Sequence, residues 1–415
     1  MRVLDGRKAE LLIRTRERRG MAGLDEVEAQ VRRIVNDVRK NGERGLRRYA
    51  ERLDGVGKRE PVAVTEEEMK RAWQECDATF RSALELAAGN IRRFCEWQKP
   101  TEWRREAAPG VSIGQIVRPL GSVGCYVPGG RYPLPSTMLM TVIPAQVAGV
   151  REIRVVSPRP ARETMAAAAF LGVRQMFRIG GAQAIAALAY GTDSIAQVDK
   201  IVGPGNKYVT AAKRLVSNDC AIDMLAGPTE VVVVSHAGNA AFIASDLVAQ
   251  AEHDPDASAI FITSNAKLGR EVAAETMRQA RGNKIALQSL KRNGAVLRMD
   301  SPEEAMEAAN RMAPEHLTID AENVAAVQNA GSVFVGDWSP QAGGDYASGP
   351  NHVLPTGGAA RFRGGLSVLD FLKLISVQDL SAAGLRSIAP AITTLAEAEG
   401  LVAHAESIRV RCGNA

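Results

Sequence analysis

The chain has 415 residues, of which 46% are hydrophobic and 24% are charged, and its formal net charge is +5. This length and apolar content allow a sizeable buried core and predict two or more domains. Aromatic residues make up only 5% of the chain, and basic runs such as residues 14–19 and 44–48 are interleaved with Glu and apolar residues. These features predict solvated helix faces and argue against a nucleic-acid-binding surface.

The five cysteines include no CxxC pair, which predicts a reducing, cytoplasmic compartment and argues against a disulfide framework. The N-terminus is polar and charged, so no signal peptide is expected. The longest apolar run, residues 138–150, is too short to span a bilayer and contains Pro144, so no membrane-spanning segment is expected either.

The first hundred residues predict amphipathic helices. Apolar residues recur at helical spacing over 24–53, and Gly42 interrupts the pattern. A second helical region covers about 66–97. This part of the chain shows no obvious chemistry.

From Gly114 onward, short strands alternate with helices. Strands are predicted at 116–119, 123–127, 153–156, 175–179, 231–234 and 259–263 and near Val296, and helices at about 137–148, 164–171, 182–190 and 268–279. This alternation predicts parallel sheets with helices on both faces, and two similar α/β units would fit residues 126–228 and 229–360. An alanine-rich helix is expected from Leu395 to about Ser407.

Two glycine-rich turns stand where a strand is expected to meet a helix. Gly180-Gly181 precedes the helix at 182–190, and Gly203-Pro204-Gly205 precedes another. Small residues at such a turn let a phosphate approach the backbone N–H groups of a helix N-terminus. Neither stretch is a GxGxxG or GxxxxGK[ST] fingerprint, so each signal is weak and plain turns are the alternative interpretation.

The stretch 245–254 reads as the polar end of a buried helix. Asp246, Gln250 and His253 stand four and then three residues apart, which places them on one helical face. Their carboxylate, amide and imidazole groups offer oxygen and nitrogen ligands to a cation. The sequence therefore suggests a metal site around Gln250 and His253. The alternative is a helix whose polar face meets water.

Candidates for acid–base chemistry occur in Ala313-Pro314-Glu315-His316. Proline at a first helical position would place His316 in the first turn of a helix, where the helix dipole favours the neutral imidazole that a general base needs. Glu315 could activate a water molecule. The alternative is a helix cap with a surface Glu-His pair.

Three further polar residues lie nearer the C-terminus. Asp345 belongs to a glycine-rich turn that can aim a carboxylate, or it forms a simple Asx turn. Glu399 and His404 are five residues apart on the expected C-terminal helix, so they would not share a face.

Taken together, these stretches resemble the histidinol dehydrogenases. The matching segments are GCYVPGGRYPLPST (124–137), GGAQAIAALAYGT (180–192), VDKIVGPGNKYVTAAK (198–213), IDMLAGPTEV (222–231), DLVAQAEHD (246–254), APEHL (313–317), GDYASGPNHVLPT (344–356) and GLSVLDFLK (365–373), with Glu399 and His404. The resemblance covers about residues 20–410. In that family, L-histidinol is oxidised through L-histidinal to L-histidine with two NAD+, the last step of histidine biosynthesis.

The resemblance implies a set of site residues. It implies that Glu315 and His316 are the catalytic acid–base pair. The implied zinc ligands, one ion per subunit, are Gln250, His253, Asp345 and a partner subunit's His404. The implied substrate contacts are Thr229, Gln250, His253, His316, Asp345, Glu399 and His404, and the implied NAD contacts are Tyr126, Gln183 and Asn206. Relatives often carry Ser where this chain has Thr229, and the hydroxyl is kept.

The resemblance also implies two Rossmann-like domains without the usual GxGxxG fingerprint, in an intertwined homodimer. The expected division is an N-terminal arm (1–19), a discontinuous catalytic and metal-binding α/β domain (20–125 and 229–365), an NAD-contacting α/β domain (126–228) and a C-terminal dimer-exchange segment (366–415).

The sequence also allows several other functions. Cys125, beside Tyr126, could form a thiohemiacetal as in some aldehyde-oxidising enzymes, or be a small buried strand residue. A related zinc-dependent NAD dehydrogenase could act on another small polar alcohol. A zinc hydrolase would use Glu315 as its base without NAD+, and a metal-binding module would show no turnover.

Overall fold

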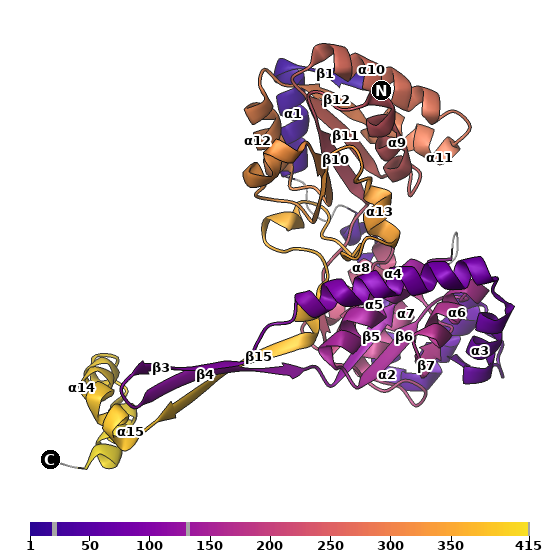
Figure 1. Cartoon of the computed structure of the whole chain (residues 1–415). Coiled ribbons are helices and arrows are strands. Elements are labelled where there is room, and N and C mark those ends of the chain that lie inside the picture. Colours follow the sequence, from indigo (N-terminus) through magenta and orange to yellow (C-terminus); the bar gives the residue numbers. More distant parts are fainter. Residues whose placement is uncertain (19–22, 130–132, 414–415) are drawn as a thin grey trace.

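The chain folds into two α/β units and a projecting arm (Figure 1). The computed structural model describes residues 1–18, 23–129 and 133–413. Within these ranges the strands form two six-stranded sheets, here called sheet A and sheet B, and one three-stranded sheet. The expected α/β class with parallel, Rossmann-like sheets is confirmed.

Sheet A has the order β1-β12-β11-β10-β13-β14, and its pairings are parallel. Its strands are β1 (Arg2–Leu4), β10 (Glu230–Val234), β11 (Ser258–Thr263), β12 (Ala295–Arg298), β13 (His316–Ile319) and β14 (Ser332–Val335). One face packs against α1 (Gly6–Glu17) and α12 (Pro302–Met312), and the other against α9 (Ala240–Ala251), α10 (Ala266–Gln279) and α11 (Lys284–Asn293). Because both faces are covered, residues 231–234 of β10 are a continuous apolar run and do not alternate with polar residues.

Sheet B has the order β2-β7-β6-β5-β8-β9, parallel except for the edge strand β2. Its strands are β2 (Ala63–Val64), β5 (Ser122–Tyr126), β6 (Glu152–Val156), β7 (Gln175–Phe177), β8 (Lys200–Val202) and β9 (Ala221–Ile222). One face packs on α2 (Leu24–Tyr49), α7 (Gly181–Tyr190) and α8 (Lys207–Val216), and the other on α3 (Glu66–Glu75), α4 (Ala78–Trp97), α5 (Pro135–Ala148) and α6 (Arg162–Phe170).

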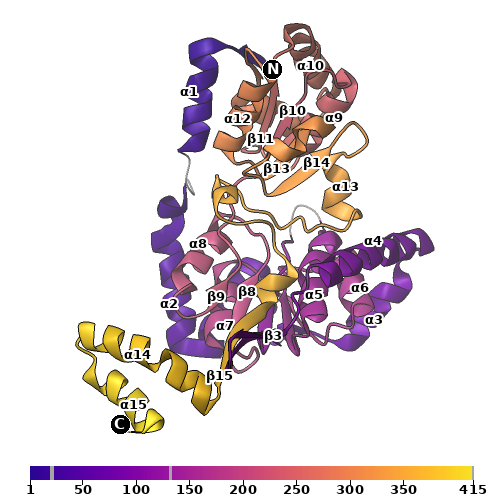
Figure 2. The ribbon, with the colours of Figure 1, turned by 60° about the vertical axis from the view of Figure 1, so that its left-hand side comes forward.

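The arm consists of the antiparallel sheet β15-β4-β3 and two helices, and it extends away from both sheets in Figures 1 and 2. Its elements are β3 (Trp103–Ala108), β4 (Val111–Pro119), β15 (Leu372–Leu380), α14 (Ala382–Ala398) and α15 (Val402–Cys412). Many apolar side chains of the arm are exposed, among them Trp103, Leu374, Ile375, Leu395, Leu401, Val402 and Val410. Shorter turns are η1 (Ala50–Asp54), η2 (Ala321–Ala326), η3 (Ala359–Arg361) and η4 (Val368–Phe371).

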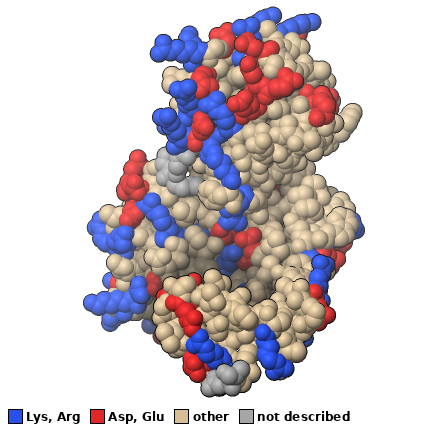
Figure 3. Space-filling model, turned by 90° about the vertical axis from the view of Figure 1, so that its left-hand side faces the viewer, with Lys and Arg blue, Asp and Glu red and all other residues tan. Residues whose placement is uncertain are grey.

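The N-terminal helices agree with the periodicity of the sequence. Gly42 interrupts α2 with a φ of +51°, at the predicted break. The basic runs form pairs within helices, such as Arg14 with Glu10 at 2.6 Å and Arg47 with Glu43 at 3.0 Å. On the face drawn in Figure 3, basic and acidic side chains are intermixed. Among the described residues, no helix has the length and apolar composition needed to cross a bilayer.

The division into domains differs from the expected one. Residues 1–17 do not form a separate arm, because β1 pairs with β12 and Ala9 and Ile13 are buried against sheet A. The helices within residues 24–97 cover sheet B, so this segment joins residues 126–228 and not 229–365. The placement of residues 1–17 on sheet A and of residues 24–97 on sheet B depends on contacts between distant segments. Local periodicity in the sequence does not reveal such contacts. Residues 19–22, at the expected first boundary, and 130–132 lie outside the described residues.

The expected helix over 395–407 is two helices. α14 ends at Ala398, and Gly400 has a φ of +75° in the turn before α15. Glu399 therefore caps α14, while His404 lies in α15.

Candidate active site

The predicted catalytic residues gather at the amino ends of β10 and β13. Thr229 directly precedes β10, Glu315 directly precedes β13, and His316 is the first residue of β13. The parallel register places His316 beside Val231. In doubly wound sheets ligands usually bind at the carboxyl ends of the strands, so this cluster occupies the opposite edge of sheet A.

The position of His316 corrects the sequence interpretation. Ala313 ends α12 with a φ of +46°, and Pro314 follows the helix instead of opening one. Proline is common just after a helix because it cannot continue it. His316 is consequently a buried strand residue and does not lie in the first turn of a helix.

A short hydrogen-bond chain surrounds the Glu315 carboxylate. The Thr229 hydroxyl donates to Glu315 Oε2 at 2.5 Å, and the Glu230 backbone N–H donates to the same oxygen at 2.9 Å. The Gln250 side-chain amide donates to the Thr229 hydroxyl oxygen. Burial raises the pKa of Glu315 to about 7, against the opposing effects of His316 and these donors.

His316 lies between two carboxylates. Its Nδ1 is 3.2 Å from the Glu230 carbonyl oxygen and 3.6 Å from Glu315 Oε2, and its Nε2 is 3.5 Å from Asp345 Oδ1. Burial disfavours the imidazolium, but Glu315 and Asp345 outweigh it and raise the pKa of His316 to about 9. The cluster therefore stabilises a proton on this imidazole, which is the product of its action as a base.

Asp345 comes from α13 (Gln341–Tyr346), which packs beside α9. Burial acts to raise the pKa of Asp345, but the contact with His316 and the charge of that residue outweigh burial and lower it. The charge of His253 also contributes to this lowering of the pKa of Asp345. α9 ends at Ala251, however, and His253 is an exposed residue just beyond the helix, not part of a shared helical face with Asp246.

The predicted metal ligands fit a zinc ion by chemical type. Gln250, His253 and Asp345 offer an amide oxygen, an imidazole nitrogen and a carboxylate oxygen, all of which bind zinc or related cations. Nearby, His316 Nε2 and Gln341 Oε1 are buried without a hydrogen-bond partner, as expected beside a site for a polar ligand. Within the described ranges, no three His, Cys, Asp or Glu side chains of this chain could hold a metal ion together. Contacts connect two of the predicted ligands, Gln250 and Asp345, through Thr229, Glu315 and His316.

Glu399 and His404 are not at this site in the single chain. Both are exposed and lie at the end of the arm, away from sheet A in both ribbon views (Figures 1 and 2).

The predicted nucleotide contacts lie at the carboxyl edge of sheet B. Tyr126 ends β5, and its hydroxyl oxygen accepts from the Gly181 N–H at 3.1 Å. Gln183 is buried in α7 with its Oε1 unpartnered, and Asn206 caps the N-terminus of α8. Strand order reverses between β5 and β8, so these residues surround the topological switch point where nucleotides usually bind.

The glycine turns at this edge have structural causes. A Cβ at Gly180 would come within 2.5 Å of the Pro158 side chain, and one at Gly203 within 2.1 Å of the Tyr126 carbonyl oxygen. Close packing within the protein therefore requires glycine at both positions, with or without a bound phosphate.

Sequence reasoning missed two polar residues. Asp54, at the end of η1, accepts from the Gly180 N–H at 3.1 Å and from Gln183 Nε2 at 2.8 Å. Gln341 contacts Gln250 from α13. Gln341 stands four residues before Asp345, a helical spacing that could have drawn attention to it, whereas no sequence signal connects Asp54 to residue 183.

Cys125 does not offer a reactive thiolate. It is fully buried in β5, and burial raises its pKa to about 12. The structure therefore favours its interpretation as a small core residue.

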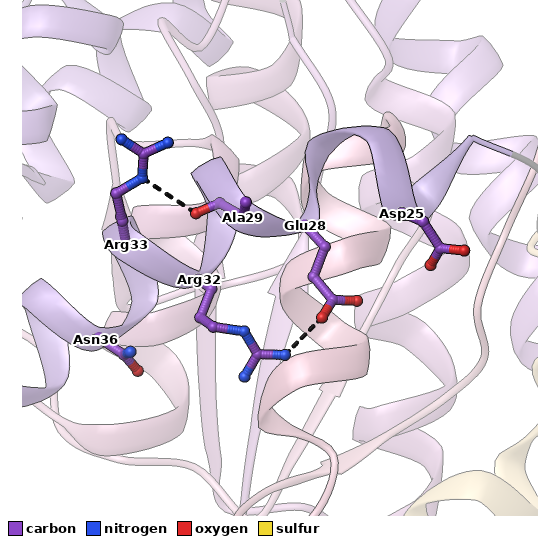
Figure 4. A pocket seen from close by; sticks show the side chains of 6 residues that line it. All are labelled: Asp25, Glu28, Ala29, Arg32, Arg33 and Asn36. Carbon is purple, nitrogen blue, oxygen red and sulfur yellow. Dashed lines mark hydrogen bonds and ion pairs between the residues drawn. The ribbon is translucent and has the colours of Figure 1, made fainter.

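A shallow cavity of about 520 Å³ lies elsewhere, on the outer face of α2 (Figure 4). It is lined by Asp25, Glu28, Ala29, Arg32, Arg33 and Asn36. Glu28 and Arg32 pair with each other at 2.5 Å, and no predicted site residue lines the cavity, so it adds nothing to the active site.

Comparisons with known proteins point to one family. The sequence model of the family described as histidinol dehydrogenase matches residues 17–412. The histidinol dehydrogenase of Methanosarcina mazei is 45% identical over 94% of this chain and 93% of its own, and that of Bacillus anthracis is 46% identical over the same shares. The crystal structure of histidinol dehydrogenase from Elizabethkingia anophelis superposes with a TM-score of 0.94 at 34% identity, covering 99% of this chain and 98% of that one.

Proposed function

The chain belongs to the histidinol dehydrogenase family of NAD-dependent oxidoreductases, and from this premise we propose that it oxidises L-histidinol through L-histidinal to L-histidine with two NAD+ and a zinc ion in each subunit. This would be the last step of histidine biosynthesis. The observation that carries the proposal is the cluster of Thr229, Glu315, His316 and Asp345, in which Glu315 and His316 are buried. The five free cysteines support the expected cytoplasmic location.

We assign zinc binding to Gln250, His253 and Asp345 of one chain and His404 of a second copy. Zinc accepts imidazole and amine nitrogens, so the ion would hold histidinol by its ring and amino group and position its hydroxyl-bearing carbon. Thr229 and Glu399 complete the proposed substrate contacts. Tyr126, Gln183 and Asn206 are the proposed contacts of NAD.

In the first oxidation, His316 takes the proton of the substrate hydroxyl while a hydride leaves the same carbon for the nicotinamide. The products of this step are the aldehyde, NADH and a protonated imidazole. The carboxylates beside His316 stabilise the imidazolium that forms in this step.

In the second oxidation, Glu315 removes a proton from a water molecule that adds to the aldehyde carbon. His316, having released its first proton, takes another as the second hydride leaves. The Thr229 hydroxyl and Glu230 N–H occupy Glu315 Oε2, which leaves Oε1 to meet the water.

The direct test measures NADH formation with L-histidinol, before and after chelation of the metal. We expect two NADH per substrate and loss of turnover on chelation, reversed by added zinc. A positioned base contributes about two to four decades in rate, so His316→Ala should lose both oxidations by that factor. Glu315→Gln should lose mainly histidinal oxidation, and normal histidinal turnover by this variant would refute the role of Glu315.

We further propose a homodimer in which the arm of each chain completes the other chain's site. The exposed apolar side chains of the arm support this arrangement, because an isolated chain would leave them in water. Co-expression of a Glu315→Gln chain with a His404→Ala chain tests it. A mixed dimer would contain one site with both residues intact and should recover histidinal oxidation, which neither variant should perform alone.

A further inference from the structure

Gln341 is a fully buried polar residue at the start of α13. Its Nε2 donates a hydrogen bond of 2.7 Å to Oε1 of Gln250, the proposed zinc ligand. Its own Oε1 is buried and has no hydrogen-bond partner. A buried amide held by one directional contact is expected to have a specific purpose, since an unsatisfied buried polar atom costs free energy.

The hydrogen bonds from Gln341 through Gln250 and Thr229 to Glu315 all run in one direction. Because Gln250 Oε1 accepts from Gln341, the amide nitrogen of Gln250 faces Thr229 and donates to its hydroxyl oxygen. The single hydroxyl proton of Thr229 is then free to point at Glu315 Oε2. A carbonyl oxygen has two lone pairs, so Gln250 Oε1 keeps one for a cation.

A side-chain amide can turn by half a rotation at little steric cost, because its nitrogen and oxygen are nearly equal in size. In the turned state Gln250 would present NH₂, which cannot bind a cation, where Oε1 now lies. Its oxygen would face Thr229 and compete with Glu315 for the hydroxyl proton.

We propose that Gln341 is a positioning residue that holds the Gln250 amide in its zinc-binding orientation and thereby directs the Thr229 hydroxyl to Glu315. This inference rests on the proposed zinc site. It deepens that proposal by adding a residue that touches neither metal nor substrate but determines which atom of Gln250 faces the metal.

The test measures how Gln341→Met changes zinc affinity in two backgrounds, the otherwise unchanged chain and the Gln250→Glu variant. Methionine keeps the length of the side chain but has no amide donor or acceptor. In the otherwise unchanged chain, zinc affinity, measured by competition with a chromophoric chelator, should fall by about 10- to 100-fold, as is typical when a group supporting a metal ligand is lost. In the Gln250→Glu background the two carboxylate oxygens are equivalent, so orientation no longer matters and Gln341→Met should change zinc affinity little.

The control is Gln146→Met, which removes a hydrogen-bonded amide from α5, and it should leave zinc affinity unchanged. An equal loss of zinc affinity from Gln341→Met in both backgrounds would show that Gln341 acts only by packing and would overturn the inference. An unchanged zinc affinity in both backgrounds would also overturn it. Should the methionine variant not fold, Gln341→Ala carries the same comparison. Absence of zinc binding by the unaltered chain would instead refute the proposed function.

Discussion

A buried ion pair beside the proposed nucleotide edge gives the sharpest test of the energetics. Lys213 of α8 pairs with Asp223, and their side chains are 3% and 0% exposed. Lys213 Nζ also donates to the Gly203 carbonyl oxygen at 3.0 Å, while the Gly203 N–H donates to Asp223 Oδ2 at 2.7 Å. The pair therefore anchors the turn between β8 and α8. We predict that Lys213→Met strongly destabilises the protein.

The size of the effect follows from burial. Removing one partner of a buried pair leaves an uncompensated charge and typically costs about 3–5 kcal/mol. Asp223 retains the N–H groups of Gly203 and Met224, so the lower half of that range, about 3–4 kcal/mol, is expected. Whole domains are stable by about 5–15 kcal/mol, so the loss would be a large fraction of the total.

Urea unfolding followed by circular dichroism measures this loss. The matched control is Lys207→Met, on the same helix, because Lys207 pairs with Glu26 at 3.5 Å while 49% and 73% of their side chains are exposed. Exposed pairs contribute about 0–1 kcal/mol. If Lys213→Met costs no more than this control, burial does not set the strength of the interaction and the reasoning is wrong. Adding Asp223→Asn to Lys213→Met should recover part of the lost stability, since no unpaired charge then remains.

Three further predictions concern other parts of the chain. Burial raises the pKa of Asp246 to about 6, so its ionised form destabilises the fold by up to about 3 kcal/mol at pH 7. Asp246→Asn should therefore be more stable than the natural chain at pH 7, and thermal melts should show the advantage shrinking as the pH falls from 6 toward 4; a constant advantage would contradict the assignment. Gly203→Ala should lower the melting temperature, because Gly203 has a φ of +113° and a Cβ would meet the Tyr126 carbonyl oxygen, whereas Gly343→Ala, with nothing within 4 Å, should not. Thr65→Ala should cost about 1 kcal/mol in urea unfolding, because it removes the capping box that Thr65 forms with Glu68, and an unchanged midpoint would show that this cap adds nothing.

Local patterns in the sequence were enough to predict most of the secondary structure and the class of fold. Alternating strands and helices predicted the parallel sheets, and Gly42 marked the break in α2. These features depend on residues close together in the chain, where side-chain periodicity and backbone conformation are decided. The family resemblance, resting on many short motifs in one order, supplied the candidate residues.

Only the tertiary structure decided which distant segments meet. β1 joins sheet A by pairing with β12, and the helices of residues 24–97 cover sheet B, although both were expected elsewhere. His316 lies in a strand because Ala313 ends the preceding helix and because residues 316–319 complete the sheet beside β10, a pairing that outweighs any local tendency toward a helix turn. Gln341 reaches Gln250 only because α13 folds back on α9. Such contacts join residues that are far apart in the chain, and burial and hydrogen bonding across that distance leave no periodic signal in the sequence.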